Sequence, residues 1–154
     1  MPENKTIFET LHHVCIVVED IDDAMRYFEN LGVCDWQDYP PLSDYVEVSL
    51  ERSEFESLTY KLCNLGNIQL QLCQPGPGNT AQRRFLEDRG PGVYHLGFDV
   101  PDVAEAERIG QDAGLAPGVR GRRADGSGFT YFQTGAALGV TLEVRASPGT
   151  SLGT

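Results

Sequence analysis

The stretch HVCIVVEDIDDAMRYFENLGV, at residues 13–33, decides the fold because it occurs twice in the chain. A second version, HLGFDVPDVAEAERIGQDAGL, occupies residues 95–115. The identical positions are His13/His95, Val18/Val100, Asp20/Asp102, Ala24/Ala106, Arg26/Arg108 and Gly32/Gly114. Such a repeat indicates one supersecondary unit that is built twice, so the same elements are expected in both copies.

Each copy has the pattern of a strand, a capped helix and a glycine stop. A short apolar run opens each copy and favours a strand. Asp20 and Asp102 follow that run and stand where a helix N-cap is expected. Gly32 and Gly114 follow the last helical turn, where a glycine commonly ends a helix.

The two copies also end alike. The segments GNIQLQLC (66–73) and LGVTLEVR (138–145) both alternate with a period of two, which is typical of a half-buried strand. When the segments are superimposed, Gln71 and Glu143 take equivalent positions. Each of them faces away from the leucine that precedes it, since neighbours on a strand alternate faces.

Further strand candidates lie between these landmarks, so each copy is predicted to be βαβββ. They are VCDWQDY (33–39), ESLTYKLCNLG (56–66), LAPGVRGR (115–122) and GFTYFQTG (128–135). The first copy is longer, and its extra residues fall within 39–57, where we expect a longer loop or a hairpin. The chain is thus predicted to be one domain, 1–154: module one at 8–75, a linker at 76–92 with a helix over 80–89, module two at 93–146, and a disordered tail at 147–154.

The composition excludes several classes of partner. The chain has 12 Lys and Arg against 23 Asp and Glu, a net charge of −11. A protein of this charge lacks the basic surface that nucleic acids or anionic membranes require. There is no apolar run long enough to span a bilayer and no secretory signal, so a cytoplasmic protein is expected. Cys15, Cys34, Cys63 and Cys73 form no C-x-x-C pair and are interpreted as reduced, mostly buried thiols.

A metal site is one interpretation of the polar residues on the outer strands of each copy. If the first and last strands of each copy are adjacent, the side chains of His13, Gln71, His95 and Glu143 converge on one surface. Two imidazoles, an amide oxygen and a carboxylate suit a divalent first-row metal. The alternative is a pair of inherited hydrogen-bonding histidines without a metal. His12 points to the opposite face and is interpreted as structural or exposed.

The paired modules resemble the vicinal-oxygen-chelate superfamily, which includes glyoxalase I, extradiol dioxygenases and bleomycin-binding proteins. Within it, the chain is most similar to the methylmalonyl-CoA epimerase family. The matching stretches are LHHVCIVVEDIDDAMRYFENLGV (11–33), NLGNIQLQLCQPGPG (64–78), FLEDRGPGVYHLGFDVPDV (85–103) and GVTLEV (139–144). The resemblance implies an α+β fold in which the two modules form a curved, eight-stranded mixed sheet around a metal-centred cleft.

The resemblance also implies a site and a reaction. Its metal ligands would be His13, Gln71, His95 and Glu143, holding one divalent ion such as Co, Zn, Ni, Mn or Mg. The implied activity is that of a metal-dependent isomerase or epimerase, which removes an α-proton through a metal-stabilised enolate. A homodimer is the habit of the family.

Two glutamates are candidates for the catalytic acid and base. Glu143 is one, as a ligand that can also exchange protons. Glu47 is the other, because the motif DYVEVSLE (44–51) resembles the position of a second glutamate in epimerases. An alignment without a gap places Tyr60 there instead, and Glu47 is then an exposed acid on the long loop.

The substrate is expected to be a small molecule, with an acyl-CoA ester as the candidate that the resemblance implies. Two departures from the epimerase pattern count against that ester: Tyr94-His95 replaces two adjacent histidines, and Gln133-Thr134-Gly135 replaces a His-Pro-Lys turn. The acidic chain would also repel a polyanion unless local arginines reverse the field. The arginines in question are Arg83, Arg84, Arg120, Arg122 and Arg123, which could equally form a solvated face.

Three other functions remain open at this point. A glyoxalase I-type lyase would use the same ligands. An extradiol-type dioxygenase would need only His13, His95 and Glu143 around iron, and a fourth ligand at Gln71 counts against it. A small-molecule (drug) binding protein of the same fold would hold no metal.

Overall fold

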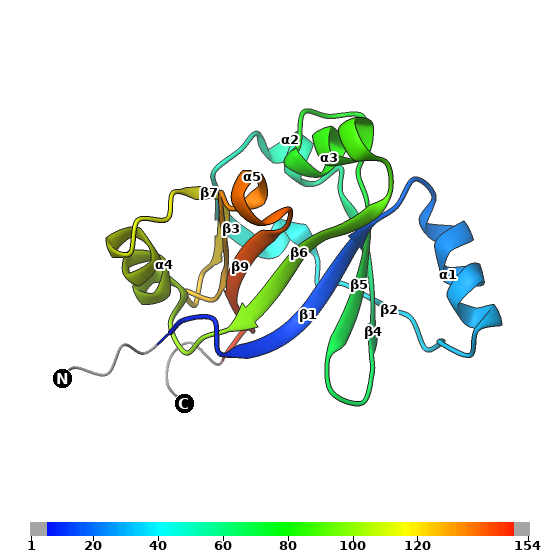
Figure 1. Ribbon diagram of the computed structural model, residues 1–154, viewed down its shortest axis with the longest axis horizontal. Helices are drawn as coiled ribbons and strands as arrows, with labels where there is room; N and C mark the ends of the chain where they lie inside the picture. The colour runs from blue at the N-terminus through cyan, green and yellow to red at the C-terminus, as the bar shows by residue number, and fades with distance from the viewer. Residues whose placement is uncertain (1–5, 150–154) are drawn as a thin grey trace. The chain divides into compact units, whose positions relative to one another are not determined.

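The structure is a computed structural model that describes residues 6–149 (Figure 1). The residues outside that range, 1–5 and 150–154, include most of the tail predicted to be disordered. The chain contacts define two compact units. The amino-terminal unit comprises 13–44 and 50–95, and the carboxy-terminal unit comprises 6–12, 45–49 and 96–149.

The amino-terminal unit places four strands beside the first half of β6. Its strands are hydrogen-bonded in the order β2-β4-β5-β1-β6, with β1 and β5 parallel and β4 antiparallel to both β2 and β5. The elements are β1 (Thr10–Val17), α1 (Ile21–Asn30), β2 (Gln37–Asp38), the 3-10 turn η1 (Leu42–Asp44), α2 (Arg52–Phe55), β4 (Thr59–Asn64), β5 (Gln69–Gln74) and α3 (Ala81–Arg89).

The carboxy-terminal unit continues from the second half of β6. Its strand order is β6-β9-β8-β7-β3, with antiparallel pairs from β9 to β3. The elements are β3 (Tyr45–Val48), β6 (Gly92–Asp99), α4 (Val103–Asp112), β7 (Pro117–Arg123), β8 (Gly128–Phe132), α5 (Gly135–Leu138) and β9 (Thr141–Ala146). Since His95 ends one unit and Leu96 begins the other, β6 belongs to both.

The helix boundaries confirm the caps predicted from the repeat. Asp20 Oδ1 accepts a hydrogen bond from Asp23 N at 3.0 Å, and Asp102 Oδ1 accepts one from Glu105 N at 3.1 Å. These bonds satisfy backbone N–H groups that have no partner within the helix. Gly32 (φ +89°) follows α1 at a positive φ that glycine adopts without strain. The linker helix is present as α3, capped by Thr80.

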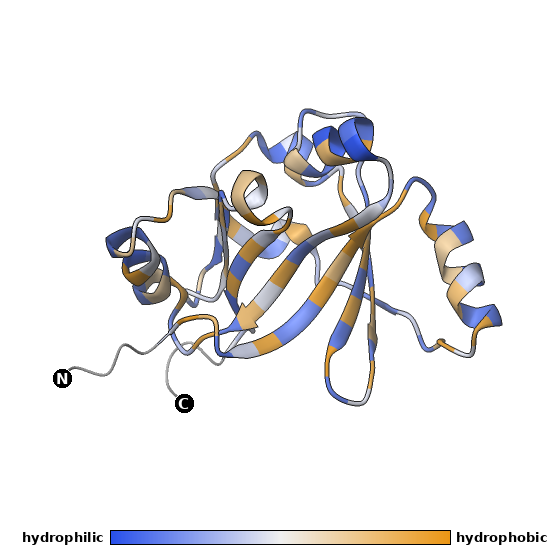
Figure 2. Ribbon diagram, in the orientation of Figure 1, coloured by the Kyte–Doolittle hydropathy of each residue, from blue (hydrophilic) through white to orange (hydrophobic). Residues whose placement is uncertain are grey.

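The α+β class is confirmed, and all eight predicted strands are present. The segment predicted as a longer loop or hairpin supplies a ninth strand, β3, which pairs antiparallel with β7 in the carboxy-terminal unit. The strand expected at 33–39 is shorter than predicted, since only Gln37 and Asp38 pair with β4. Hydrophobic and hydrophilic residues alternate along most strands, as their two faces require (Figure 2).

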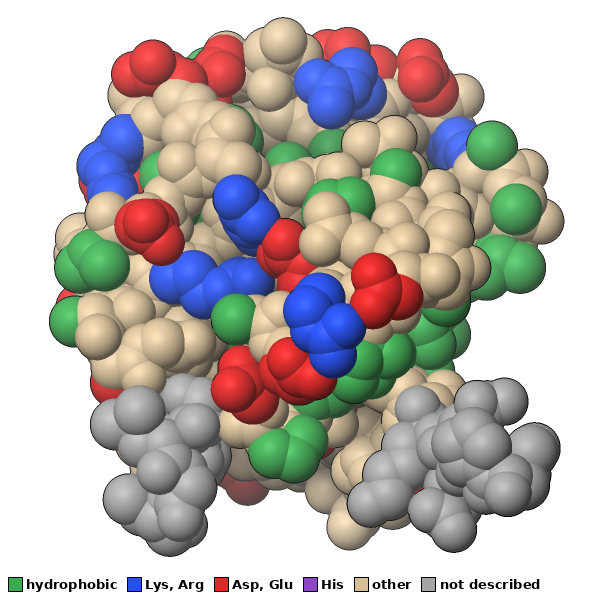
Figure 3. Space-filling view, turned by 90° about the vertical axis from the view of Figure 1, so that its left-hand side faces the viewer, with side chains coloured by type: hydrophobic (Ala, Val, Ile, Leu, Met, Phe, Trp, Pro, Cys, Tyr) green, Lys and Arg blue, Asp and Glu red, His purple; other side chains and the backbone are tan. Residues whose placement is uncertain are grey.

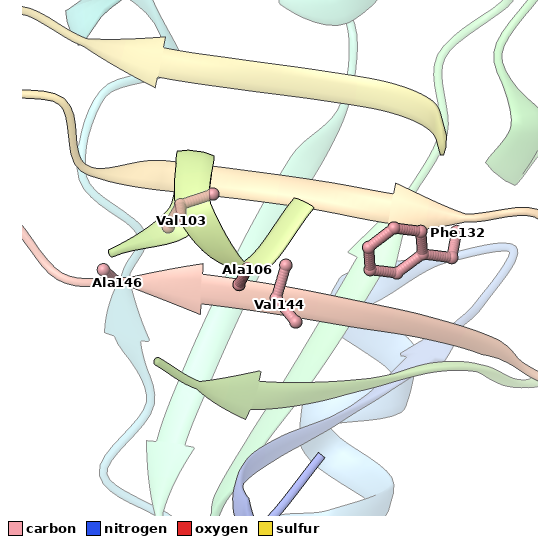
Figure 4. Packing of buried hydrophobic residues seen from close by; sticks show 5 residues of the cluster. All are labelled: Val103, Ala106, Phe132, Val144 and Ala146. Carbon is pink, nitrogen blue, oxygen red and sulfur yellow. The ribbon is translucent and has the colours of Figure 1, made fainter. Parts of the chain in front are cut away.

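A buried cluster fixes α4 on its sheet. Val103 and Ala106 from α4 pack on Phe132 of β8 and on Val144 and Ala146 of β9 (Figure 4). Each is at most 3% exposed, so the helix face that carries the repeat alanine, Ala106, is the buried face. Burial of this apolar surface is the main favourable term that holds α4 on the sheet.

Cys15, Cys63 and Cys73 are buried, Cys34 is exposed, and none of the four is in a disulfide. Within residues 6–149, we find no helix with the length and apolarity needed to cross a bilayer.

Candidate metal centre

His13 and His95 form a close pair in the amino-terminal unit. They lie on the neighbouring strands β1 and β6 and are 3% and 1% exposed. Their Nε2 atoms are 2.9 Å apart, and the rings meet edge to face with centroids 5.0 Å apart. The repeat therefore brings its two equivalent histidines into direct contact.

The spacing of the two nitrogens suits a shared cation. Two cis nitrogen ligands at about 2.1 Å from an ion are themselves about 3.0 Å apart. Without an ion, one Nε2 has to donate a hydrogen bond to the other, because two lone pairs facing each other at this distance would repel. A metal ion is bound by a neutral imidazole, whose ring nitrogen directs its lone pair at the ion.

Gln71 lies on β5, the other neighbour of β1. The parallel register sets Gln71 opposite Cys15 and sets Gln69 opposite His13. Gln71 is only 4% exposed, and its Nε2 donates a hydrogen bond to Gln69 Oε1 at 2.7 Å. Gln69 and Gln71 thus share a face, as the period of two predicts, and the Gln71 amide lies on the face that His13 occupies.

Glu143 lies on β9 in the carboxy-terminal unit, opposite Tyr131 on β8, and is 5% exposed. Within that unit, Val100 N donates to Arg145 O at 3.0 Å. The matching bond in the first copy, from Val18 N to Cys73 O, measures 2.9 Å. The last strand of each copy therefore has the same register relative to the first strand of that copy. Glu143 on β9 thus has the same position relative to β6 as Gln71 on β5 has relative to β1.

These residues meet the chemical requirements of a metal group. His13 and His95 in the amino-terminal unit and Glu143 in the carboxy-terminal unit are all buried, and each offers one ligand atom. Buried imidazole and carboxylate groups are costly unless they are paired or bind an ion. The donor set of two nitrogens and a carboxylate oxygen, with an amide oxygen on β5, fits a divalent first-row ion.

Cys73 shares the Gln69–Gln71 face of β5 and is fully buried. Burial raises the pKa of the Cys73 thiol to about 12, although a hydrogen bond with Tyr60 partly offsets that rise. In the absence of an ion, the thiol therefore stays protonated at neutral pH. Tyr60 lies on β4 opposite Cys73, and its hydroxyl accepts a hydrogen bond from Gln82 Nε2 at 3.2 Å.

Glu47 has a different setting from the other candidates. It is exposed on β3, at the edge of the sheet, and its register partner is Arg122 on β7. Three steps of strand pairing separate β3 from β9, the strand of Glu143. Glu47 and Glu143 both belong to the carboxy-terminal unit, whereas His13, His95 and Gln71 belong to the amino-terminal unit.

The arginine clusters are engaged by the protein itself. Arg83 donates to the carbonyl oxygens of Pro75 and Gly76 at 2.6 and 3.0 Å. On the other cluster, Arg120 and Arg122 both bind the buried carboxylate of Glu107, at 2.5 and 2.9 Å. Side chains of both signs lie next to one another on the side of the molecule that carries α4 (Figure 3).

The ion pairs of Glu107 with Arg120 and Arg122 connect α4 to β7. Burial alone would raise the pKa of Glu107, but a hydrogen bond from Thr130 and the charges of Arg120 and Arg122 outweigh it and lower the pKa. Thr130 Oγ1 donates at 2.6 Å. The carboxylate therefore stays ionised and holds both guanidinium groups.

Comparison with known proteins agrees with this architecture. The sequence model of the glyoxalase/bleomycin resistance protein/dioxygenase superfamily matches residues 12–132. The chain therefore belongs to that superfamily.

Individual relatives are more distant. Methylmalonyl-CoA epimerase from Mycobacterium tuberculosis shares 23% identity with a TM-score of 0.69, covering 96% of this chain and 94% of its own. A Streptomyces coelicolor methylmalonyl-CoA epimerase in complex with 2-nitronate-propionyl-CoA shares 21% with a TM-score of 0.68, covering 92% and 99%. At these identities the likeness shows the fold. The uncharacterized protein YqjC of Bacillus subtilis (strain 168) is 27% identical over 89 residues, covering 57% of this chain and 55% of YqjC.

Proposed function

We propose that the protein is a metal-dependent isomerase or epimerase that removes the α-proton of a carbonyl substrate through an enolate. The observation that carries this proposal is the buried His13–His95 pair, with its 2.9 Å separation between Nε2 atoms. Membership of the superfamily supports it. The proposed ligands are His13, Gln71, His95 and Glu143.

The chain's own residues have separate tasks in this reaction. A divalent ion bound there would supply Lewis-acid stabilisation to the charge that develops on the substrate's carbonyl oxygen. His13 and His95 provide neutral nitrogen donors from one unit. Glu143 provides a carboxylate that can accept the departing proton, and its burial limits competition from water.

A fourth protein ligand distinguishes the proposed isomerase from a ring-cleaving dioxygenase. Two histidines and one carboxylate alone would match the triad of a non-haem iron oxygenase. Gln71 lies buried on the same face as His13, and its amide oxygen would occupy a position that an oxygenase leaves open for substrate or oxygen. Four protein donors therefore favour isomerisation.

An acyl-CoA thioester is the first substrate to examine, because structural neighbours bind one. One of these structures is a methylmalonyl-CoA epimerase in complex with methylmalonyl-CoA and NH4+, at 21% identity. A homodimer and a cytoplasmic location stay predictions.

The decisive experiment pairs metal analysis with proton exchange. We expect the purified protein to bind one divalent ion per chain and to exchange the α-proton of methylmalonyl-CoA in D2O, followed by NMR. His13→Ala and His95→Ala should lose the ion, because each removes a nitrogen donor.

His12→Ala is the matched control. It changes the neighbouring histidine on the opposite face of β1, so metal content and exchange should match the parent protein. Metal content that is unchanged in His95→Ala would contradict the site. A metal-loaded protein that leaves methylmalonyl-CoA, methylglyoxal–glutathione hemithioacetal and simpler α-acidic carbonyl compounds unchanged would contradict the isomerase.

A further inference from the structure

Three side-chain amides form a continuous chain along one face of β4 and β5. Gln69 Nε2 donates a hydrogen bond to Asn64 Oδ1 at 3.1 Å. Gln69 Oε1 in turn accepts a hydrogen bond from Gln71 Nε2 at 2.7 Å. Asn64 and Gln69 are register partners on the two strands, so the chain runs from the exposed edge of the hairpin inward to the buried Gln71.

The direction of this chain determines which atom of Gln71 is available. A primary amide has one oxygen that accepts and one NH2 group that donates. Because Asn64 accepts, Gln69 must turn its NH2 toward Asn64 and its oxygen toward Gln71. Gln71 then uses its NH2, which leaves the amide oxygen as the atom it can present to a cation.

Only one of the two orientations of Gln71 allows it to bind a metal. Cations are bound by the carbonyl oxygen of an amide, whereas its NH2 carries a partial positive charge and repels them. A Gln71 amide turned by 180° would therefore replace a ligand with a repulsive group. With Asn64 and Gln69 oriented as they are, turning Gln71 alone would set two amide oxygens against each other, so the amide chain favours the productive orientation.

The second copy of the repeat has no need for such a device. Its equivalent of Gln71 is Glu143, whose carboxylate presents an oxygen in either orientation. The residue equivalent to Gln69 is Thr141, whose side chain is too short to continue an amide chain. The long amide at position 69 thus occurs in the copy whose ligand needs to be oriented.

We propose that Gln69 and Asn64 are positioning residues that fix the Gln71 amide with its oxygen toward the metal. This inference rests on the proposed metal centre. Residues that orient a metal ligand typically change affinity by about 10- to 100-fold when they are removed.

The test compares variants of position 69 in the full-length protein loaded with Co²⁺. In Gln69→Leu, Gln71 loses its acceptor and can turn, so we expect about 10-fold weaker Co²⁺ binding by calorimetry and an altered visible absorption spectrum of the bound ion. Gln69→Glu keeps an acceptor for Gln71 Nε2, so the parent spectrum should return. Asn64→Asp accepts only, which enforces the same direction, and should also keep the parent spectrum.

Thr141→Val is the matched control at the equivalent position of the second copy, and we expect it to leave affinity and spectrum unchanged. Circular dichroism establishes that each variant is folded. A folded Gln69→Leu with the parent affinity and spectrum would overturn the positioning role. Co²⁺ binding that survives His95→Ala would instead overturn the metal centre itself, so the two failures are distinguishable.

Discussion

Two histidines at 2.9 Å behave as one group rather than two. Without an ion between them, one Nε2 has to donate a hydrogen bond to the other, because two lone pairs at this distance would repel. A divalent ion removes this conflict, because both nitrogens can direct a lone pair at it. The repeat makes the pair possible, because it places a histidine on each of the neighbouring strands β1 and β6.

The two candidate glutamates differ in what their removal should do. Glu143→Gln keeps an oxygen donor but cannot accept a proton, so we expect the metal to be retained and α-proton exchange to fall by about 10²- to 10⁴-fold. Glu47 is exposed on an edge strand, so Glu47→Gln should cost at least about tenfold less than Glu143→Gln. Single-turnover exchange in D2O compares them, and an equal or larger loss in Glu47→Gln would show that Glu47 is the principal base.

Individual residues were predictable from the sequence where a short pattern has one physical meaning. The caps at Asp20 and Asp102 and the glycine stops follow from local backbone requirements, and the structure confirms them. The role of Gln69 was not predictable in this way. The period of two places it beside Gln71, but the contact with Asn64 depends on the register of the β4–β5 hairpin.

Among the helices and strands, β3 is the element whose pairing the sequence patterns did not predict. The first copy is ten residues longer than the second, but no local pattern in those residues indicates which strand they pair with. A strand in that segment forms because β7 offers it an edge in the carboxy-terminal unit, and that partner lies more than 70 residues away in the chain. Long-range pairing of this kind is what single-sequence patterns do not carry.

Gly110 of α4 lies against the ring of Phe132 on β8. A Cβ added at Gly110 would lie 2.5 Å from the ring of Phe132, which is fully buried. Although alanine is the better helix former by about 1 kcal/mol, we expect Gly110→Ala to destabilise the protein by about 1–3 kcal/mol through overpacking.

Gly135→Ala serves as the control for that substitution. Gly135 begins the short helix α5, and a Cβ there meets no atom within 4 Å. Its effect on the free energy of unfolding should stay within about 0.5 kcal/mol of zero. Urea unfolding compares the two variants, and a neutral Gly110→Ala would mean that Phe132 can move aside.

The excess of acidic over basic residues in the whole molecule affects how readily it can bind an anionic substrate. Each lysine and arginine in the described part of the chain has a protein partner, and most of these partners are carboxylates. The pairs with carboxylates include Arg26–Asp23, Arg52–Glu56, Lys61–Asp38, Arg108–Glu105, Arg108–Asp112, Arg120–Glu107, Arg122–Glu107 and Arg145–Asp99. A CoA ester carries several phosphate charges, so its binding has to compete with these pairs as well as with a net charge of −11.

This balance predicts the salt dependence of catalysis. Between like charges, added salt screens repulsion, so the KM for methylmalonyl-CoA should fall as ionic strength rises from about 0.01 to about 0.15 M. The pantetheine thioester of the same acid lacks the nucleotide phosphates, and its KM should change less. If the KM for the CoA ester rises with salt instead, attractive arginines must dominate its approach. Arg83→Gln and Arg123→Gln would then test two of them, whose guanidinium groups donate to carbonyl and hydroxyl oxygens.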